Sequence, residues 1–299
     1  MPPPPPPGRR PGCGRARAGD ERRVRRPGRG GGRTLCGVGQ DTWEVGGAYE
    51  AYVGRWSRRV AAVFVPGLAV PGGQKWLDVG CGTGALSAAV LARADPATIV
   101  GVDPSEGFLA EARTLIGDPR ASFRVADAQT LPFPDGVFAA VVSGLALNFV
   151  PDPGRAVAEF ARVARRGGVV AAYVWDYADG MEMMRYFWDA AAAVDPAAAE
   201  RDEGRRFPLC QPEPLSDLWA GAGLDAVSVR AIEIPTVFTG FDDFWRPFAG
   251  GQGPAPAYVA SLPGDRRTAL CDLLRERLPT GARGSISLTA RAWAVYGNA

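Results

Sequence analysis

The chain has 299 residues, of which 46% are hydrophobic, including eight Trp and thirteen Phe. This is ample apolar material for one large domain or two small ones, and it excludes global disorder. The sequence contains no His, which excludes a His general base, a His-containing triad and His metal ligands. The five cysteines are odd in number and widely spaced, without a CxxC pair. A disulfide framework or a zinc site is therefore not expected, and a reducing cytosol fits best.

The formal net charge of +2 is distributed unevenly. Residues 1–39 carry ten Arg against Asp20 and Glu21, a local balance of +8, so the remaining residues sum to −6. An acidic body gives no reason to expect nucleic-acid binding. No apolar run reaches the roughly 18 residues that a membrane span requires, and the N-terminus lacks the apolar stretch of a signal peptide. We therefore expect a cytoplasmic protein without a membrane span, and oligomeric state is left open.

Residues 1–40 are a low-complexity segment. A run of six prolines is followed by Arg/Gly/Pro-rich sequence, which cannot bury enough apolar surface to offset its ordering entropy. We predict a disordered tail at 1–40, either inert or acting as a basic arm, and leave open whether it is translated. The folded domain is predicted to comprise residues 41–299.

The ordered part begins with one apolar helical stripe over residues 48–65, which Pro66-Gly67 ends. Strands then alternate with helices, and this order predicts a parallel sheet with helices on both faces. The predicted strands are 75–79, 98–102, 122–125, 137–143 and 169–175, and the predicted helices are 84–93, 105–116 and 152–166. The last of these helices is expected to begin at the N-cap Asp152 with Pro153 and to stop at Gly167-Gly168.

The pattern changes after the fifth strand. Residues 181–222 have a helical pattern interrupted by prolines, and residues 226–234 alternate like a strand. Residues 241–278 are aromatic, then Gly/Pro-rich, then helical. Residues 285–296 predict the last strand, and no internal repeat is visible.

A glycine-rich loop follows the first predicted strand: Leu-Asp-Val-Gly-Cys-Gly-Thr-Gly, residues 77–84. Glycines let the backbone turn tightly and approach a ligand, and the next helix N-terminus offers free N–H groups. Gly80-x-Gly82-x-x-Ala85 also fits the dinucleotide fingerprint. Asp103 ends the next strand, where a carboxylate can accept hydrogen bonds from both ribose hydroxyls of an adenosine. That role serves several adenosine cofactors and does not distinguish between them.

A third segment distinguishes a dinucleotide site from a site for another adenosine-containing cofactor. Asp127-Ala128-Gln129 leads through Leu-Pro-Phe-Pro-Asp-Gly, residues 131–136, into the fourth strand. With the glycine loop and Asp103, it resembles the class I S-adenosylmethionine (SAM) dependent methyltransferases, in the group that includes the ubiquinone/menaquinone C-methyltransferases. One departure is Ala139, where that family often has Asp. The resemblance covers residues 48–175 well and 176–299 only in outline.

The resemblance implies a Rossmann-like, doubly wound, mostly parallel seven-stranded α/β sheet with an antiparallel last strand. It also implies helical lid insertions at about 177–222 and 237–282. SAM would be held by residues at the strand ends and on the first helix: Asp78, Gly80, Gly82, Thr83, Asp103, Asp127, Ala128, Ser143 and Tyr49. In this scheme Asp103 binds the ribose diol, Asp127 accepts from the adenine amine, and Ser143 with Leu145 flanks the methionine portion. Tyr49 and Trp56 either close over the cofactor or pack as core.

Methyl transfer from a sulfonium is an in-line displacement that needs mainly alignment and desolvation. With no His available, Asp176 is the best candidate for a base and Glu182 the second, although catalysis by proximity alone is equally allowed. Tyr173, Trp175 and Tyr177 either line the substrate pocket or belong to the core.

Residues 143–146 lack the Asn/Asp-Pro-Pro-Tyr pattern with which methyltransferases of nucleic acids and protein amines hold a planar nitrogen. We therefore expect C- or O-methylation of a small molecule. An apolar, polycyclic or quinone-like acceptor is suggested by the aromatic residues of the insertions, which alternatively only pack the lid: Phe187, Trp188, Phe238, Phe241, Phe244, Trp245 and Phe248. The alternatives are an NAD(P)-linked Rossmann oxidoreductase and a non-catalytic SAM-binding scaffold protein.

Overall fold

The computed structural model describes Met1, residues 54–250 and residues 253–299. The predictions for the tail at 1–40, for Tyr49 and for the start of the first helix lie outside the described residues. The described part of that helix is α2 (Arg55–Gly67), which includes Pro66 and Gly67 and so ends two residues later than predicted.

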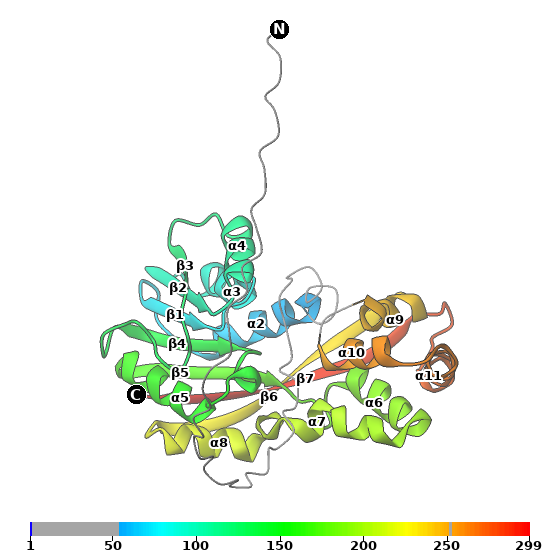
Figure 1. Ribbon diagram of the computed structural model, residues 1–299. Coiled ribbons are helices and arrows are strands. Elements are labelled where there is room, and N and C mark those ends of the chain that lie inside the picture. The colour runs from blue at the N-terminus through cyan, green and yellow to red at the C-terminus, as the bar shows by residue number, and fades with distance from the viewer. Residues whose placement is uncertain (2–53, 251–252) are drawn as a thin grey trace, which may run out of the picture. The chain divides into compact units, whose positions relative to one another are not determined.

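Seven strands form one sheet in the order β3-β2-β1-β4-β5-β7-β6 (Figure 1). Their bounds are β1 (Lys75–Val79), β2 (Thr98–Asp103), β3 (Ala121–Val125), β4 (Phe138–Gly144), β5 (Ala164–Trp175), β6 (Asp225–Phe238) and β7 (Ile286–Asn298). The first five strands pair in parallel, and β7 runs antiparallel to both of its neighbours. The predicted Rossmann-like sheet with an antiparallel last strand is confirmed.

Burial along the strands explains why their sequences differ. Six consecutive residues of β4, from Phe138 to Ser143, are buried, as a central parallel strand covered on both faces requires. The second half of the edge strand β6 instead alternates between exposed and buried residues. Its buried residues, among them Ile232 and Ile234, face the core.

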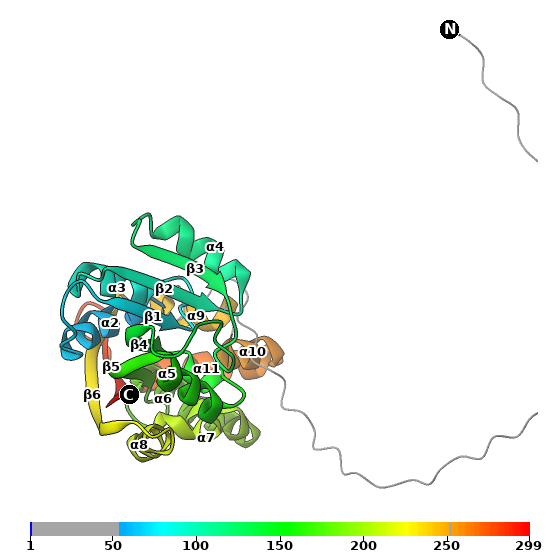
Figure 2. The same cartoon turned by 90° about the vertical axis from the view of Figure 1, so that its left-hand side faces the viewer.

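Helices cover both faces of the sheet (Figure 2). Side chains of α2 and α3 (Ala85–Arg93) belong to the hydrophobic core on one face. Those of α5 (Pro153–Val163) and α8 (Pro212–Gly221) belong to the core on the other. The helix α4 (Glu106–Leu115) packs against β2 and β3. This layering leaves the carboxyl ends of the parallel strands as the edge at which ligands bind in such sheets.

One predicted boundary is wrong. The helix expected to continue to residue 166 ends at Val163, and β5 begins at once with Ala164. The Gly167 N–H donates to the carbonyl of Ala299 at 2.6 Å, and the Ala299 N–H donates to the carbonyl of Gly168 at 3.0 Å. Pairing with the distant C-terminal residue therefore extends the strand through the two glycines that sequence reasoning assigned to a helix stop.

The segment between β5 and β6 holds α6 (Glu182–Val194), η3 (Pro196–Arg201), α7 (Glu203–Arg206), η4 (Pro208–Cys210) and α8. The indole N–H of Trp219 on α8 donates to the carbonyl of Val170 in β5 at 3.0 Å. Thus α8 is part of the layer that covers the sheet. Between β6 and β7 lie α9 (Phe241–Gly250), α10 (Pro254–Ser261) and α11 (Gly264–Arg277). A lid function for these insertions stays a prediction.

The aromatic residues of the insertions pack against one another. The rings of Phe187 and Phe248 stack with centroids 4.4 Å apart, and Phe187 contacts Trp188 edge to face. The indole N–H of Trp188 donates to the buried carboxylate of Glu203. Phe187, Trp188 and Phe248 are therefore buried in the same hydrophobic core as the side chains of α2 and α3.

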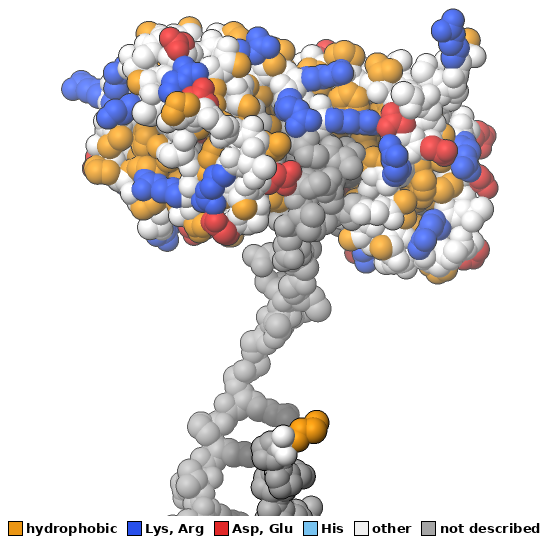
Figure 3. All heavy atoms as spheres, turned by 90° about the horizontal axis from the view of Figure 1, so that it is seen from above, with side chains coloured by type: hydrophobic (Ala, Val, Ile, Leu, Met, Phe, Trp, Pro, Cys, Tyr) orange, Lys and Arg blue, Asp and Glu red, His pale blue; other side chains and the backbone are white. Residues whose placement is uncertain are grey.

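No helix among the described residues is long and apolar enough to cross a membrane. On the face shown in Figure 3, basic side chains are interspersed with apolar and acidic ones.

Candidate active site

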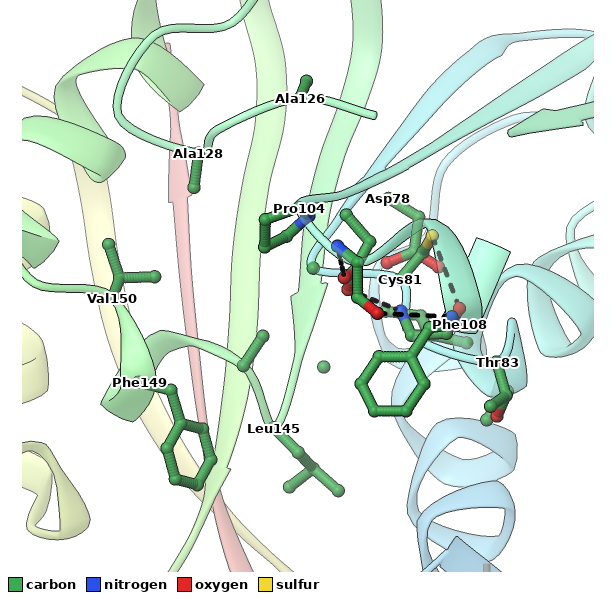
Figure 4. Close-up of a pocket in the computed structure, with 18 of the residues that line it drawn as sticks. Asp78, Cys81, Thr83, Pro104, Phe108, Ala126, Ala128, Leu145, Phe149 and Val150 are labelled. Carbon is green, nitrogen blue, oxygen red and sulfur yellow. Dashed lines mark hydrogen bonds between the residues drawn. The ribbon is translucent and has the colours of Figure 1, made fainter. Parts of the chain in front are cut away.

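A cavity of about 320 Å³ opens at the carboxyl ends of β1, β2 and β4. Figure 4 shows Asp78, Cys81 and Thr83 on one side of it and Phe149 and Val150 on the other. Its lining includes seven of the predicted cofactor residues: Asp78, Gly80, Gly82, Thr83, Asp103, Asp127 and Ala128. Residues spread over 50 positions of the sequence are thus brought together, because the strands that carry them are neighbours in the sheet.

The glycine loop owes its shape to backbone that only glycine adopts easily. Gly80 and Gly82 have φ values of +71° and +52°. A Cβ at Gly80 would overlap the Cβ of Ala146, whereas a Cβ at Gly82 would meet nothing within 4 Å. The N–H groups of Gly80 and Cys81 both donate to the carbonyl of Val102, at 2.8 and 3.0 Å. The loop is therefore fastened to the neighbouring strand, with open space above Gly82.

The carboxylate of Asp103 joins two loops of the site. Its Oδ2 accepts a hydrogen bond from the Gly82 N–H at 3.0 Å, and its Oδ1 accepts one from the Ser105 N–H at 2.9 Å. Burial raises the pKa of Asp103, and the two backbone donors partly oppose that rise. Each carboxylate oxygen can accept more than one hydrogen bond, so capacity for a ligand's hydroxyl groups remains.

Asp78 is fully buried beneath the glycine loop. Its Oδ2 accepts a hydrogen bond from the Ser87 hydroxyl at 2.7 Å, while its Oδ1 has no hydrogen-bond partner among the described residues. Burial raises the pKa of Asp78 to about 7, and the bond from Ser87 opposes this rise. An unpaired buried carboxylate oxygen beside a cavity suits a ligand that brings a donor or a positive charge.

Asp127 and Ala128 form the upper wall, after β3. Asp127 is exposed, and its Oδ1 accepts hydrogen bonds from the backbone N–H and the side-chain amide of Gln129, at 2.9 and 3.1 Å. These bonds lower the pKa of Asp127, which therefore stays ionised. Figure 4 shows Ala128 next to Ala126 on the same wall.

Of the remaining residues considered in the sequence analysis, some line the cavity and others do not. Leu145 lines the cavity, but Ser143 does not and is buried within β4. Trp56 packs edge to face on Phe238, at 5.6 Å between ring centroids, and belongs to the core. The three aromatic residues at or just after the end of β5 are all buried in the core, and of these Tyr173 also lines the cavity.

Asp176, the predicted base, does not line this cavity. Its Oδ2 accepts a hydrogen bond from the guanidinium of Arg291 on β7 at 2.7 Å, and its Oδ1 accepts one from the Asp179 N–H at 3.0 Å. Its side chain is only 3% exposed. These contacts suit a residue that fixes the turn after β5, and its role as a base stays a prediction.

Sequence reasoning missed several residues that line the cavity. They are Ser57, Pro104, Phe108, Ala126, Ala146, Phe149, Val150 and Pro151. Two signals were present. Phe108 lies in the first turn of the helix that the N-cap Ser105 begins. The stretch 146–151 must cross the carboxyl edge of the sheet between the end of β4 and the N-cap Asp152.

A doubly wound sheet with a glycine loop after β1 and an acid after β2 defines a protein that binds an adenosine-containing cofactor. Residues 77–172 match the family model described as a methyltransferase domain. The ubiquinone/menaquinone biosynthesis C-methyltransferase of Desulfotalea psychrophila is 30% identical over 200 residues, which are 61% of this chain and 77% of the relative. The chain therefore belongs to the class I SAM-dependent methyltransferases.

Solved structures agree on the fold. A protein of Bacillus halodurans C-125 that has been assigned as a methyltransferase superposes with a TM-score of 0.52 and 17% identity, over 80% of this chain and 97% of that one. Phosphoethanolamine N-methyltransferase 2 of Haemonchus contortus, in complex with SAM, gives 0.53 and 16%, over 84% and 56%. Its membership of the family, shown by the domain match and the Desulfotalea relative, makes the protein an enzyme of the SAM-dependent class with SAM as its cofactor. An NAD(P)-linked oxidoreductase is not supported.

Proposed function

We propose that this enzyme methylates carbon or oxygen of a small, uncharged, predominantly apolar acceptor. The observation that carries the proposal is the distribution of charge in the cavity. Its ionisable acids, Asp78, Asp103 and Asp127, all lie on the β1–β3 side, and no Lys or Arg occurs among the described residues that line it. A sulfonium cofactor is positively charged and suits this acidic half, whereas an anionic acceptor would find no cation in the other.

The residues present fit SAM, and we assign their roles as follows. Asp103 accepts hydrogen bonds from the ribose hydroxyls while it holds the N–H of Gly82. Asp127 and the backbone of Ala128 face the adenine. The open space at Gly82 accommodates the ligand, and the unpaired Oδ1 of Asp78 lies beneath the loop, where a cationic amino group is favourable. Thr83 and Leu145 complete the wall of the cavity.

When bound, SAM supplies a methyl group on a sulfonium with a neutral leaving group. The side chains around it exclude water and fix the approach of the acceptor, and such alignment contributes several kcal/mol to a displacement. The described residues on the β4–β5 side offer no carboxylate to the cavity. We therefore propose that alignment and desolvation, rather than a side-chain base, provide most of the rate acceleration.

The test is formation of S-adenosylhomocysteine by the full chain with SAM and candidate acceptors, followed by mass spectrometry of the acceptor. Reduced demethylmenaquinone is the first acceptor to try, because a relative from Roseiflexus sp. strain RS-1, 30% identical over 192 residues, is named as a demethylmenaquinone methyltransferase. Phosphoethanolamine, which is named for the Haemonchus enzyme, and other anionic acceptors serve as the contrasting set. Turnover with an apolar phenol or quinol and none with anionic acceptors supports the proposal, and the reverse preference contradicts it. SAM binding without turnover on any acceptor would favour the non-catalytic scaffold.

A further inference from the structure

One large apolar side chain at the cavity remains partly open. Phe149, on the short helix η2 (Leu147–Phe149), is 37% exposed and lines the cavity opposite the acidic half. In Figure 4 it lies across the cavity from Asp78 and Cys81, two of the residues that surround the glycine loop.

The segment between β5 and β6 contacts this ring through Phe207. Phe149 meets Phe207 nearly at a right angle, 79°, with ring centroids 5.3 Å apart, and Phe207 in turn contacts the buried Tyr177 at 6.0 Å. A second contact joins the same two segments, because the side-chain amide of Asn148 donates to the sulfur of Cys210 at 3.7 Å. Two independent contacts therefore hold η2 against residues 207–210, so Phe149 is a placed ring rather than a free one.

The surroundings of Phe149 define what such a ring can recognise. Its neighbours in the cavity wall, Leu145, Ala146, Val150 and Pro151, carry no charge. Aromatic rings attract other rings in offset or edge-to-face arrangements, with a gain beyond that of burial alone. An aliphatic group of equal size would receive only the burial contribution, and an anion would lose solvation without gaining a partner.

We propose that Phe149, positioned by Phe207, is a specificity-determining residue that holds the aromatic ring of an uncharged acceptor. This inference rests on the proposed function and narrows it from apolar acceptors in general to planar aromatic ones. In this proposal Phe149 contacts the acceptor, and Phe207 acts only by positioning Phe149. Replacing either phenylalanine by alanine should therefore weaken acceptor binding without weakening cofactor binding.

Three probes of similar size separate the possibilities: 2-naphthol, its saturated counterpart decahydro-2-naphthol, and 2-naphthoic acid. Each is titrated calorimetrically into the full chain saturated with S-adenosylhomocysteine. The proposal predicts that 2-naphthol binds at least about fivefold more tightly than either of the other two, the scale of one aromatic contact. Equal binding of the aromatic and the saturated alcohol, or preferred binding of the acid, overturns it.

Variants then assign the effect to the ring. Phe149→Ala should weaken 2-naphthol binding by about fivefold or more, while Phe149→Tyr retains it within about twofold. The affinity for S-adenosylhomocysteine should be unchanged in both, and circular dichroism shows that both are folded. Unchanged 2-naphthol binding in Phe149→Ala overturns the proposal, as does a parallel loss of S-adenosylhomocysteine binding. If the wild-type chain does not bind S-adenosylhomocysteine at all, the proposed function fails first, and this inference fails with it.

Discussion

The Oδ2 of Asp103 accepts a hydrogen bond at 3.0 Å from the backbone N–H of Gly82, 21 residues earlier in the chain. The acid that ends β2 therefore holds the glycine loop that follows β1. Both oxygens of Asp103 already have a backbone donor, the second being the Ser105 N–H. The ligand site is in this way organised before any cofactor arrives, which lowers the cost of binding.

Replacing Asp103 should weaken cofactor binding more than any other single carboxylate substitution. We expect Asp103→Ala to cost roughly 1.5–3 kcal/mol in the binding of S-adenosylhomocysteine, the scale of hydrogen bonds to a charged group. Calorimetric titration measures this directly. Asp118→Asn is a suitable control, because Asp118 is held by Arg120 on the surface and does not line the cavity. An unchanged dissociation constant in Asp103→Ala would remove Asp103 from the site.

The two glycines of the loop should respond differently to alanine. Gly80→Ala combines a left-handed φ with an overlap on Ala146, so we expect a loss of about 2–4 kcal/mol in the free energy of unfolding. Gly82→Ala meets no atom within 4 Å, and its conformational cost should be about 1–2 kcal/mol. Its methyl group enters the cavity, however, and should weaken cofactor binding at least about tenfold. Urea unfolding and calorimetry together distinguish a fold defect from a binding defect, and equal effects of both variants on both measurements would contradict this account.

Asp78 should make the stability of the apoprotein depend on pH. Because burial raises its pKa to about 7, the native state retains a proton between about pH 4 and pH 7 that the unfolded chain has lost. The stability associated with this group is fully present below the unfolded pKa and is lost as the pH rises through 7. The free energy of unfolding should therefore fall across this window, by an amount on the order of a few kcal/mol.

Asp78→Asn provides the comparison, since an amide of the same shape can still accept from Ser87 and does not titrate. The free energy of unfolding is measured with urea at several pH values between 5 and 8. It should fall less steeply with pH in the variant than in the wild type. Identical slopes would mean that Asp78 does not carry the pH dependence.

Substitution of Asp176 tests whether this residue stabilises the fold or acts as the catalytic base. Its ion pair with Arg291 is mostly buried on the carboxylate side, with side chains 3% and 28% exposed. We expect Asp176→Asn to lower stability by about 1–3 kcal/mol and to change kcat by less than about tenfold. Arg291→Met, which breaks the same pair from the other end, should have a similar effect. A fall in kcat of about a hundredfold or more in Asp176→Asn alone, with thermal stability unchanged, would instead establish the predicted base.

Much of the fold was predictable because its signals are local. The buried strand β4, the glycine loop and the helix start at Asp152 are each encoded by a short, contiguous stretch of sequence. The alternation of strands and helices then determined the parallel sheet and the edge at which ligands bind. Seven predicted residues consequently line one cavity.

What could not be predicted depends on contacts between distant residues. The partner of Asp176 lies 115 residues away, and the strand that replaces the end of the predicted helix pairs with Ala299. Trp56 has the spacing of a helix face, which does not say whether that face meets a ligand or Phe238. Phe149 follows no motif, and only the loop crossing the sheet edge brings it to the cavity.

The most direct test of the central claim is calorimetric titration of the full chain with S-adenosylhomocysteine and, separately, with NAD. We predict micromolar or tighter binding of S-adenosylhomocysteine, which Asp103→Ala weakens, and no binding of NAD. Binding of NAD without binding of S-adenosylhomocysteine would contradict the assignment of this cavity to SAM.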